Sequence, residues 1–119
     1  MRLLLAEDDP LNVELFVATL EDDGHAVTVE RNGIAALTRA LSQPFDLIVL
    51  DVQLPDLDGI TICQRLRAAG IGTPALAVTA LALNDQVARG LAAGFDEYLT
   101  KPISPAALRD AVRRYGTVA

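Results

Sequence analysis

Five polar residues of this chain each stand at the end of a short apolar run. Glu7 and Asp8 follow the first run, Asp51 and Thr79 end two later ones, and Lys101 follows a weaker one. A carboxylate at the end of a buried strand is costly unless a partner compensates its charge. What these residues can do together therefore depends on which of the runs are neighbouring strands.

The apolar runs and the helical patterns between them predict the fold. Five short apolar segments alternate with five stretches whose apolar residues recur at helical spacing. This alternation is typical of a parallel sheet with helices on both faces and right-handed crossovers. We therefore expect an α/β fold, a flavodoxin-like (βα)5 doubly wound sheet with strand order 2-1-3-4-5. The expected strands are residues 2–6, 26–30, 47–50, 74–79 and 96–100.

The expected helices are placed by their apolar faces and by the residues at their ends. Pro10 and Ser104-Pro105 suit helix starts, and Gly94 suits a helix end. The side chains expected on inner faces are, in chain order, Val13, Phe16, Val17 and Leu20, then Ile34, Leu37 and Leu41, then Ile62 and Leu66, then Val87 and Leu91, and last Leu108, Val112 and Tyr115.

Size and composition bound the class of protein. We expect one domain over residues 1–119, because this length suffices for a single buried core. A net charge of -6 argues against direct nucleic-acid binding, which needs a clustered basic face. No segment reaches the roughly 18 apolar residues of a membrane span, so we expect a cytoplasmic protein without membrane insertion. One cysteine, Cys63, and one histidine, His25, exclude an internal disulfide and a two-histidine metal site within one chain.

The expected strand order gathers acidic residues at one rim of the sheet. The first and third strands are neighbours in it, which brings Glu7, Asp8 and Asp51 together. Two unit charges about 4 Å apart repel by roughly 4 kcal/mol at an effective dielectric constant near 20. Either one acid stays protonated or a divalent cation lies among them. Oxygen ligands favour Mg2+, with Mn2+ and Ca2+ as alternatives.

Three other ligand sites fit the residues less well. A calcium loop that includes Asp56, Asp58 and Gly59 would need carboxylates at Leu54 and Arg65. No G-x-x-x-x-G-K phosphate loop occurs. A flavin phosphate is disfavoured because three acids, rather than hydroxyls and amides, follow the first strand.

A carboxylate, a metal ion, a lysine and a hydroxyl around one point suit phosphoryl transfer. A carboxylate such as Asp51 can act as a nucleophile toward phosphorus and form an aspartyl phosphate. Lys101 can pair with one phosphoryl oxygen and Thr79 can donate a hydrogen bond to another, while the metal neutralises charge.

Four segments make the sequence resemble a known family over essentially its whole length. They are LLLAEDD, LIVLDVQLPDLDG, AVTA and YLTKP, in that order and spacing. Together they resemble the receiver domain of bacterial two-component response regulators, most closely the single-domain chemotaxis and DivK-like kind. This resemblance implies a phosphoprotein of a phosphorelay rather than an enzyme. Its catalytic activity would be limited to its own phosphorylation and, at most, the hydrolysis of its own phosphate.

The resemblance assigns the acidic rim to phosphoryl acceptance and metal binding. It makes Asp51 the phosphoacceptor, and Asp8 with Asp51 the direct Mg2+ ligands. Gln53 would add its backbone carbonyl, and Glu7 would hold the metal through water. Mn2+ is the alternative ion, and Asp9 is left as a solvated neighbour.

The resemblance also assigns a conformational switch. Thr79 would be the switch hydroxyl and Lys101 the cation that pairs with the phosphoryl group, followed by a cis peptide bond to Pro102. Tyr98, three residues before the lysine, would turn its ring inward when the hydroxyl moves. A half-buried tyrosine on an edge strand is the alternative interpretation.

Two positions depart from many members of the family. Gln53 replaces methionine or asparagine, and Leu81 lies two residues after Thr79. Neither side chain is an obvious base for the attacking water, so we expect slow or moderate loss of the phosphate.

The expected function is a stand-alone receiver, since no effector domain fits after Ala119. It would accept a phosphoryl group from a phosphohistidine on a histidine kinase or a histidine phosphotransfer protein, and then signal to a downstream protein. The alternatives are a receiver cut from a hybrid histidine kinase, disfavoured by the start at Met1, or from a transcriptional regulator. A Mg2+-dependent phosphatase with an aspartyl nucleophile is a third, although Gln53 stands where such enzymes place a second aspartate.

Two surfaces are expected to meet these partners. The downstream protein would bind the fourth helix, fifth strand and fifth helix, with Leu81 and Leu83 as contacts. The donor would dock near the acidic rim and the first helix, where Leu11, Asn12 and Leu15 could face a helix bundle, although ordinary surface and core positions explain these three residues nearly as well.

Overall fold

The fold is an α/β sandwich around one parallel sheet. The structure, a computed structural model, describes residues 1–80 and 83–116. Five parallel strands lie in the order β2-β1-β3-β4-β5, which confirms the flavodoxin-like (βα)5 prediction. The predicted roles of Leu81 lie outside the described residues. The strands are β1 (Arg2–Ala6), β2 (Ala26–Glu30), β3 (Leu47–Asp51), β4 (Ala75–Thr79) and β5 (Glu97–Thr100).

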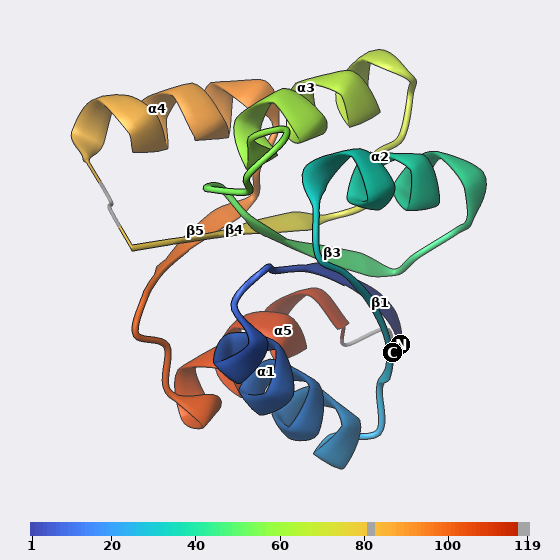
Figure 1. Cartoon of the computed structure of the whole chain (residues 1–119), viewed down its shortest axis with the longest axis vertical. Coiled ribbons are helices and arrows are strands. Elements are labelled where there is room, and N and C mark those ends of the chain that lie inside the picture. The colour runs from blue at the N-terminus through green and yellow to red at the C-terminus, as the bar shows by residue number, and fades with distance from the viewer. Residues whose placement is uncertain (81–82, 117–119) are drawn as a thin grey trace.

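Helices cover both faces of this sheet. α2, α3 and α4 form the layer on one face, and α1 and α5 form the layer on the other (Figure 1). None of the helices within the described residues is long and apolar enough to cross a membrane. The helices are α1 (Pro10–Asp22), α2 (Gly33–Ser42), α3 (Gly59–Ala68), α4 (Asn84–Ala93) and α5 (Pro105–Gly116).

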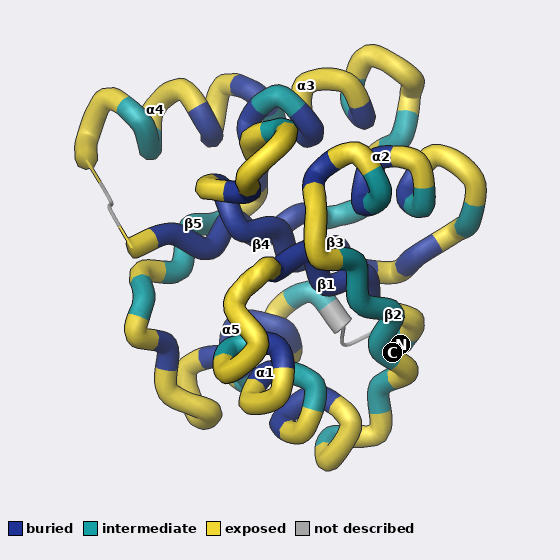
Figure 2. Tube along the Cα trace, viewed as in Figure 1, coloured by how far each residue is buried: buried dark blue, intermediate teal, exposed yellow. Residues whose placement is uncertain are grey.

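The central strands are buried on both sides, as their unbroken apolar runs predict. Every residue of β3 and of β4 is buried, and the dark blue centre of Figure 2 follows these strands. Alternate side chains face opposite layers because the strand period is two. Leu4 and Leu50 pack with α2 and α3, whereas Leu5 and Val49 pack with α1 and α5.

The helix ends have identifiable causes. Asp9, Asn32 and Asp58 are the N-caps of α1, α2 and α3, and each side chain accepts a hydrogen bond from a backbone N–H of the first turn. Ser104 does the same for α5, as predicted, through the N–H of Ala107. Gly94 ends α4 in the left-handed conformation with φ 114°, also as predicted.

α4 buries few of its residues. It begins after Leu83 without a side-chain cap, and only Gly90 and Ala93 are buried along it. These are small side chains, so the helix buries little apolar area against the rest of the molecule. Elements with few buried apolar contacts open and shift at the lowest free-energy cost.

Three predicted inner-face residues point outward instead. Ile34 and Leu41 of α2 are 60% and 49% exposed, and Leu91 of α4 is 48% exposed. The buried face of α2 is formed mainly by small residues, including Ala36 and Ala40. The predicted inner face of α2 was based on its large apolar residues, whereas α2 packs against the sheet through its small residues.

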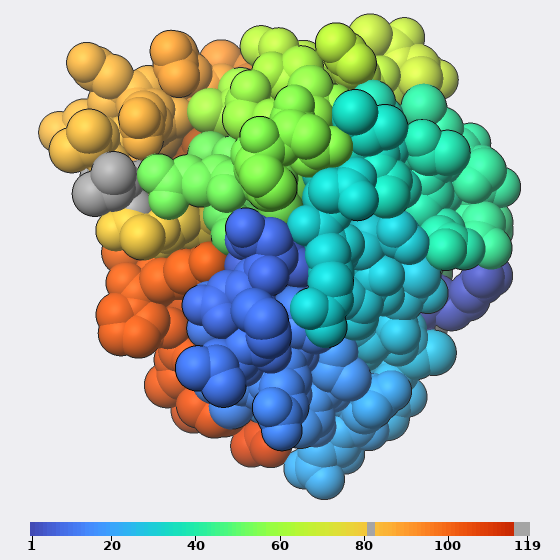
Figure 3. All heavy atoms as spheres, in the orientation of Figure 1, coloured from blue at the N-terminus to red at the C-terminus, as the bar shows by residue number. Residues whose placement is uncertain are grey.

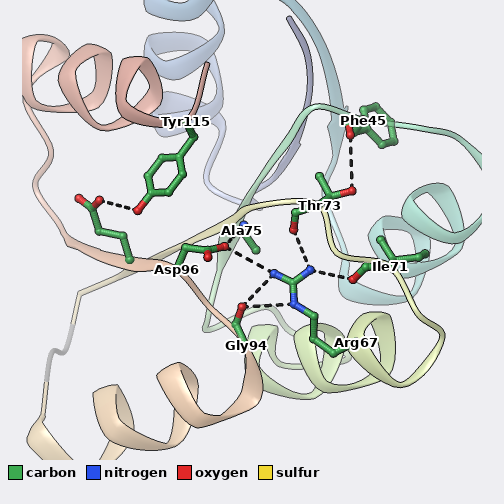
Figure 4. Close-up of polar contacts among 9 residues, drawn as sticks. Phe45, Arg67, Ile71, Thr73, Ala75, Gly94, Asp96 and Tyr115 are labelled. Atoms are coloured by element: carbon green, nitrogen blue, oxygen red, sulfur yellow. Dashed lines mark hydrogen bonds and ion pairs between the residues drawn. The ribbon is translucent and has the colours of Figure 1, made fainter. Parts of the chain in front are cut away.

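Arg67 ties together the ends of three elements at one corner of the molecule (Figure 4). Its guanidinium donates hydrogen bonds to the backbone carbonyls of Ile71, Thr73 and Gly94 at 2.7 to 3.3 Å. It also lies 3.6 Å from the carboxylate of Asp96. The end of α4 is therefore fixed to the loop that follows α3.

We expect Arg67→Met to lower the free energy of unfolding by about 2 kcal/mol, because carbonyl groups that now accept charged hydrogen bonds lose their donor. Urea unfolding followed by circular dichroism measures the change. The matched control is Arg65→Met on the same helix, where the side chain is exposed. Equal losses in the two variants would contradict the anchoring role of Arg67.

Candidate active site

The strand register delivers the predicted polar residues to one rim of the sheet. Ala6 of β1 is paired with Leu50 of β3, so the next residues along these strands, Glu7 and Asp51, lie side by side. In β4 and β5, Thr79 is paired with Thr100. Lys101 follows directly, and its backbone N–H donates to the carbonyl of Thr79 at 2.8 Å.

Lys101 lies between the two buried carboxylates. Its Nζ is 2.7 Å from Oε1 of Glu7 and 2.9 Å from Oδ2 of Asp51. The side chains of Glu7 and Asp51 are 1% and 5% exposed, so water compensates little of their charge. The sequence predicts that either one acid stays protonated or a divalent cation compensates this repulsion. The structure adds a third means of compensation, an ammonium group bridging the acids.

Backbone donors hold the other oxygen of each carboxylate. Oε2 of Glu7 accepts from the N–H groups of Asp8 and Asp9 at 3.1 and 3.2 Å. Oδ1 of Asp51 accepts from the N–H of Gln53 at 2.8 Å. Both side chains are therefore fixed in orientation.

The acidic residues fit a divalent cation. One carboxylate oxygen from each of Glu7, Asp8 and Asp51 lies within 4.8 Å of the others. Glu7 and Asp51 are buried, whereas Asp8 is exposed, so the group opens to solvent on one side. Three carboxylates without a nitrogen or sulfur ligand form a donor set that suits hard cations such as Mg2+.

The environment changes the proton affinities of two of these groups. Burial raises the pKa of Glu7 from 4.5 to about 7; the bond from Lys101 lowers it, and neighbouring Asp51 raises it. Burial acts to lower the pKa of Lys101, but its bonds with Glu7 and Asp51 raise it above its ordinary value. Lys101 therefore stays charged near neutral pH, while Glu7 can hold a proton.

The predicted switch residues belong to β4, to β5 and to the segment that follows β5. Thr79 is buried at the end of β4, and the peptide bond between Lys101 and Pro102 is cis, as the resemblance implies. The half-buried ring of Tyr98 lies edge-on to Phe95. Its hydroxyl donates to the carbonyl of Gln86 in α4 at 3.2 Å.

Gly90 provides the space for the Tyr98 ring. A Cβ atom at Gly90 would lie 1.8 Å from the Tyr98 hydroxyl oxygen. The ring and helix α4 therefore touch at a position where any larger residue would displace one of them. This contact joins β5 to α4.

Sequence reasoning missed the structural roles of three aspartates near the site. Asp9 and Asp58 are helix N-caps, a role that aspartate before a helical pattern commonly has. Asp56 accepts hydrogen bonds from the N–H groups of Gly33 and Ile34. No local pattern signals this bond, since its partners are 22 and 23 residues away.

The pKa of Glu7 predicts a pH dependence of the metal-free protein. Its folded value is about 7 and its ordinary value is 4.5, so the folded state retains a proton that the unfolded state releases. The contribution of Glu7 to the free energy of unfolding therefore decreases as the pH rises from about 5 to 7, because the unfolded state loses this proton first. We expect Glu7→Gln to remove that part of the decline, measured by urea unfolding with chelator present. The control, Glu14→Gln on the exposed side of α1, should keep the wild-type slope.

Comparison with known proteins identifies the family. A family model described as the response regulator receiver domain matches residues 3–113. The chain is 39% identical over 117 residues to the signal transduction histidine-protein kinase BarA of Escherichia coli (strain K12). That match covers 97% of this chain but 13% of BarA, so the chain spans a small part of that relative.

Solved structures agree in fold. The receiver domain of the Francisella response regulator 1452 superposes with a TM-score of 0.90 at 34% identity, covering 96% of this chain and 94% of that one. The receiver domain of the sensor histidine kinase PA1611 from Pseudomonas aeruginosa PAO1, solved with a magnesium ion coordinated in its active site cleft, gives 0.87 at 37% identity, covering 96% and 95%. This chain belongs to the response regulator receiver domain family of two-component phosphorelay signalling.

Proposed function

We propose that Asp51 accepts a phosphoryl group from a phosphohistidine of a histidine kinase or a histidine phosphotransfer protein. An oxygen of Asp51 forms the new P–O bond as the P–N bond to the donor imidazole breaks. The observation that supports this most directly is the buried carboxylate of Asp51 bound by Lys101 at the rim where Glu7 and Asp8 converge. Such a carboxylate is shielded, fixed and next to a cation.

The proposed phosphoryl transfer requires a divalent cation at the acidic residues. Asp8 and Asp51 would bind Mg2+ directly through their carboxylates, Glu7 would hold it through water, and Gln53 would add its backbone carbonyl. Mn2+ can replace it, since both ions take oxygen ligands. The bound ion supplies positive charge that favours negatively charged phosphoryl oxygens. The magnesium ion of the PA1611 receiver supports this choice by analogy.

Lys101 and Thr79 are the residues proposed to respond to the phosphoryl group. The ammonium that now bridges Glu7 and Asp51 would pair with a phosphoryl oxygen, and the Thr79 hydroxyl would donate to another. Movement of Thr79 would favour one position of the Tyr98 ring, which already contacts α4. Phosphorylation would thus shift a two-state equilibrium rather than create a new fold.

The surface of α4, β5 and α5 is the proposed site for a downstream protein. The end of α4 is anchored at Gly94, and its start has no side-chain cap. The first turn accepts a hydrogen bond from the Tyr98 hydroxyl through the carbonyl of Gln86, so a movement of Tyr98 would reach the start of α4. Leu83 and Leu91 expose 58% and 48% of their surface along it. Apolar residues on a movable helix can provide a contact that depends on the phosphorylation state.

The donor is proposed to dock at α1 beside the acidic rim. Leu11 and Leu15 are 76% and 42% exposed one helical turn apart, and Asn12 lies half-buried next to them. A helix bundle that carries the phosphohistidine could cover these two leucines while its imidazole reaches Asp51.

Within the receiver family, we propose a stand-alone cytoplasmic receiver of the DivK-like kind. It would consist of one domain over residues 1–119 and would make no direct contact with nucleic acid. The net charge of -6 supports the last point. BarA carries its similar segment within a much longer chain, and a receiver cut from such a kinase or from a transcriptional regulator would use the same site. The proposed chemistry is therefore independent of what surrounds the domain.

We expect acetyl phosphate to label the protein stoichiometrically in the presence of Mg2+, and Asp51→Asn or a chelator to abolish the label. Intact-mass spectrometry measures the added phosphoryl group. Asp85→Asn, which removes an exposed carboxylate in the first turn of α4, is the matched control and should label as the wild type does. Labelling of the Asp51→Asn variant would contradict the proposal. Multiple-turnover hydrolysis of a small phosphomonoester would favour the phosphatase alternative.

Gly90→Ala tests the proposed switch. The added methyl group would clash with the Tyr98 hydroxyl, so we expect the ring to leave its present position, at a cost of about 1 to 3 kcal/mol in unfolding free energy. The NMR signals of the Tyr98 ring and the amide exchange of α4 should change, whereas labelling by acetyl phosphate should persist. Gly72→Ala is the control, because a Cβ there meets open space. An unchanged Tyr98 spectrum would contradict the proposed coupling.

A further inference from the structure

The segment between β3 and α3, residues 52–58, carries the proposed metal ligand Gln53 and is here named the acceptor loop. Its first residues are held next to Asp51, whose Oδ1 accepts from the N–H of Gln53. Its last residues are held by the bond from the N–H of Gly59 to the carbonyl of Val52, at 3.0 Å. Asp58 caps α3 at the same end.

The middle of the acceptor loop is bound to a different element. The carboxylate of Asp56 accepts from the N–H of Gly33 at 2.6 Å through one oxygen and from the N–H of Ile34 at 3.0 Å through the other. These two donors are the first residues of α2. A carboxylate is favoured there because the first N–H groups of a helix lack partners within the helix and carry partial positive charge.

The loop and the helix also touch through their backbones. A Cβ atom at Gly33 would lie 2.3 Å from the carbonyl oxygen of Leu57. The loop, green in Figure 3, meets the start of α2, in cyan, on the surface of the molecule. Only glycine at position 33 permits this close approach, which places the carboxylate of Asp56 over the two N–H groups.

α2 does not need Asp56 as its own cap. The side chain of Asn32, directly before the helix, already accepts from the N–H of Ala35 at 2.8 Å. The bonds of Asp56 come from a distant segment, so their distinctive effect is on the loop rather than on the helix. They fix the chain three residues after Gln53, between the two ends that are held at Asp51 and Gly59.

We propose that Asp56 is a positioning residue of the phosphoacceptor site, which holds the acceptor loop against α2 so that the Gln53 carbonyl and the Asp51 side chain are placed before Mg2+ binds. This rests on the proposed function of Asp51 and its metal. Fixing ligands in advance lowers the free-energy cost of ordering them on binding. Groups that orient metal ligands commonly change metal affinity by about tenfold or more when removed.

Three variants of the full chain separate this role from two simpler ones. Asp56→Ala removes both hydrogen bonds and the charge. Asp56→Asn removes the same charge but keeps one side-chain oxygen as an acceptor. Asn32→Ala removes a cap from the same helix and leaves the loop contact in place.

Two measurements are made on each variant at fixed pH and ionic strength. Titration calorimetry with MgCl2 gives the dissociation constant of Mg2+. Amide hydrogen exchange of the metal-free protein gives the protection of the Gln53 and Gly59 N–H groups, which are hydrogen-bonded at the two ends of the loop. The second measurement needs neither metal nor phosphoryl donor.

We expect Asp56→Ala to weaken Mg2+ binding by about tenfold and to reduce protection of both N–H groups. Asp56→Asn should show a smaller loss in each measurement. Asn32→Ala should lower the free energy of unfolding by about 1 kcal/mol, as loss of a helix cap does, with Mg2+ affinity and loop protection unchanged.

Three results would overturn the proposal. Wild-type affinity and protection in Asp56→Ala would show that the loop is placed without it. Equal losses of affinity in Asp56→Ala and Asp56→Asn with unchanged protection would assign the effect to charge alone, and equal losses in Asn32→Ala would assign it to helix capping. A wild-type protein that binds no Mg2+ would instead refute the proposed metal site itself.

Discussion

Two buried carboxylates side by side are the constraint on which the rest of this structure depends. Glu7 and Asp51 are adjacent because β1 and β3 are neighbours, and both are almost closed to water. Without compensation they would disfavour the folded state. Lys101 supplies that compensation from the end of β5, two strands away from β3. The parallel sheet is therefore both the support of the site and the reason that the site needs a cation.

Much of the fold and of this rim could be predicted from the sequence, because both depend on local patterns. Unbroken apolar runs mark strands that are buried on two faces, and β3 and β4 have this property. Parallel strands deliver their last residues to one edge, so Asp51, Thr79 and Lys101 could be gathered before any coordinate was known. The predicted stop at Gly94 follows from backbone stereochemistry in the same way.

The remainder depends on distances between segments, which spacing along the chain does not contain. The prediction that Ile34 and Leu41 lie on the inner face of α2 was wrong. The helix packs closely on the sheet through alanines, whose small side chains contribute little to an apolar pattern in the sequence. The sequence offered only a calcium loop as a role for Asp56, because its hydrogen-bond partners lie 23 and 22 residues away at the start of α2. The ion pair between Lys101 and Glu7 was missed because the lysine was assigned only to the phosphoryl group.

The composition of the chain allows the rim to be followed by chemical labelling of one lysine. Lys101 carries the only ε-amine among ten basic residues, and within the described residues it pairs with two acids of the site, Glu7 and Asp51. An acylating reagent reacts with the neutral amine, a form that these partners disfavour by raising the pKa of Lys101. Whatever draws the carboxylates away from the ammonium alters the rate of that reaction. A covalent label on a single lysine can thus report the state of the whole acidic cluster without isotopes or an added fluorophore.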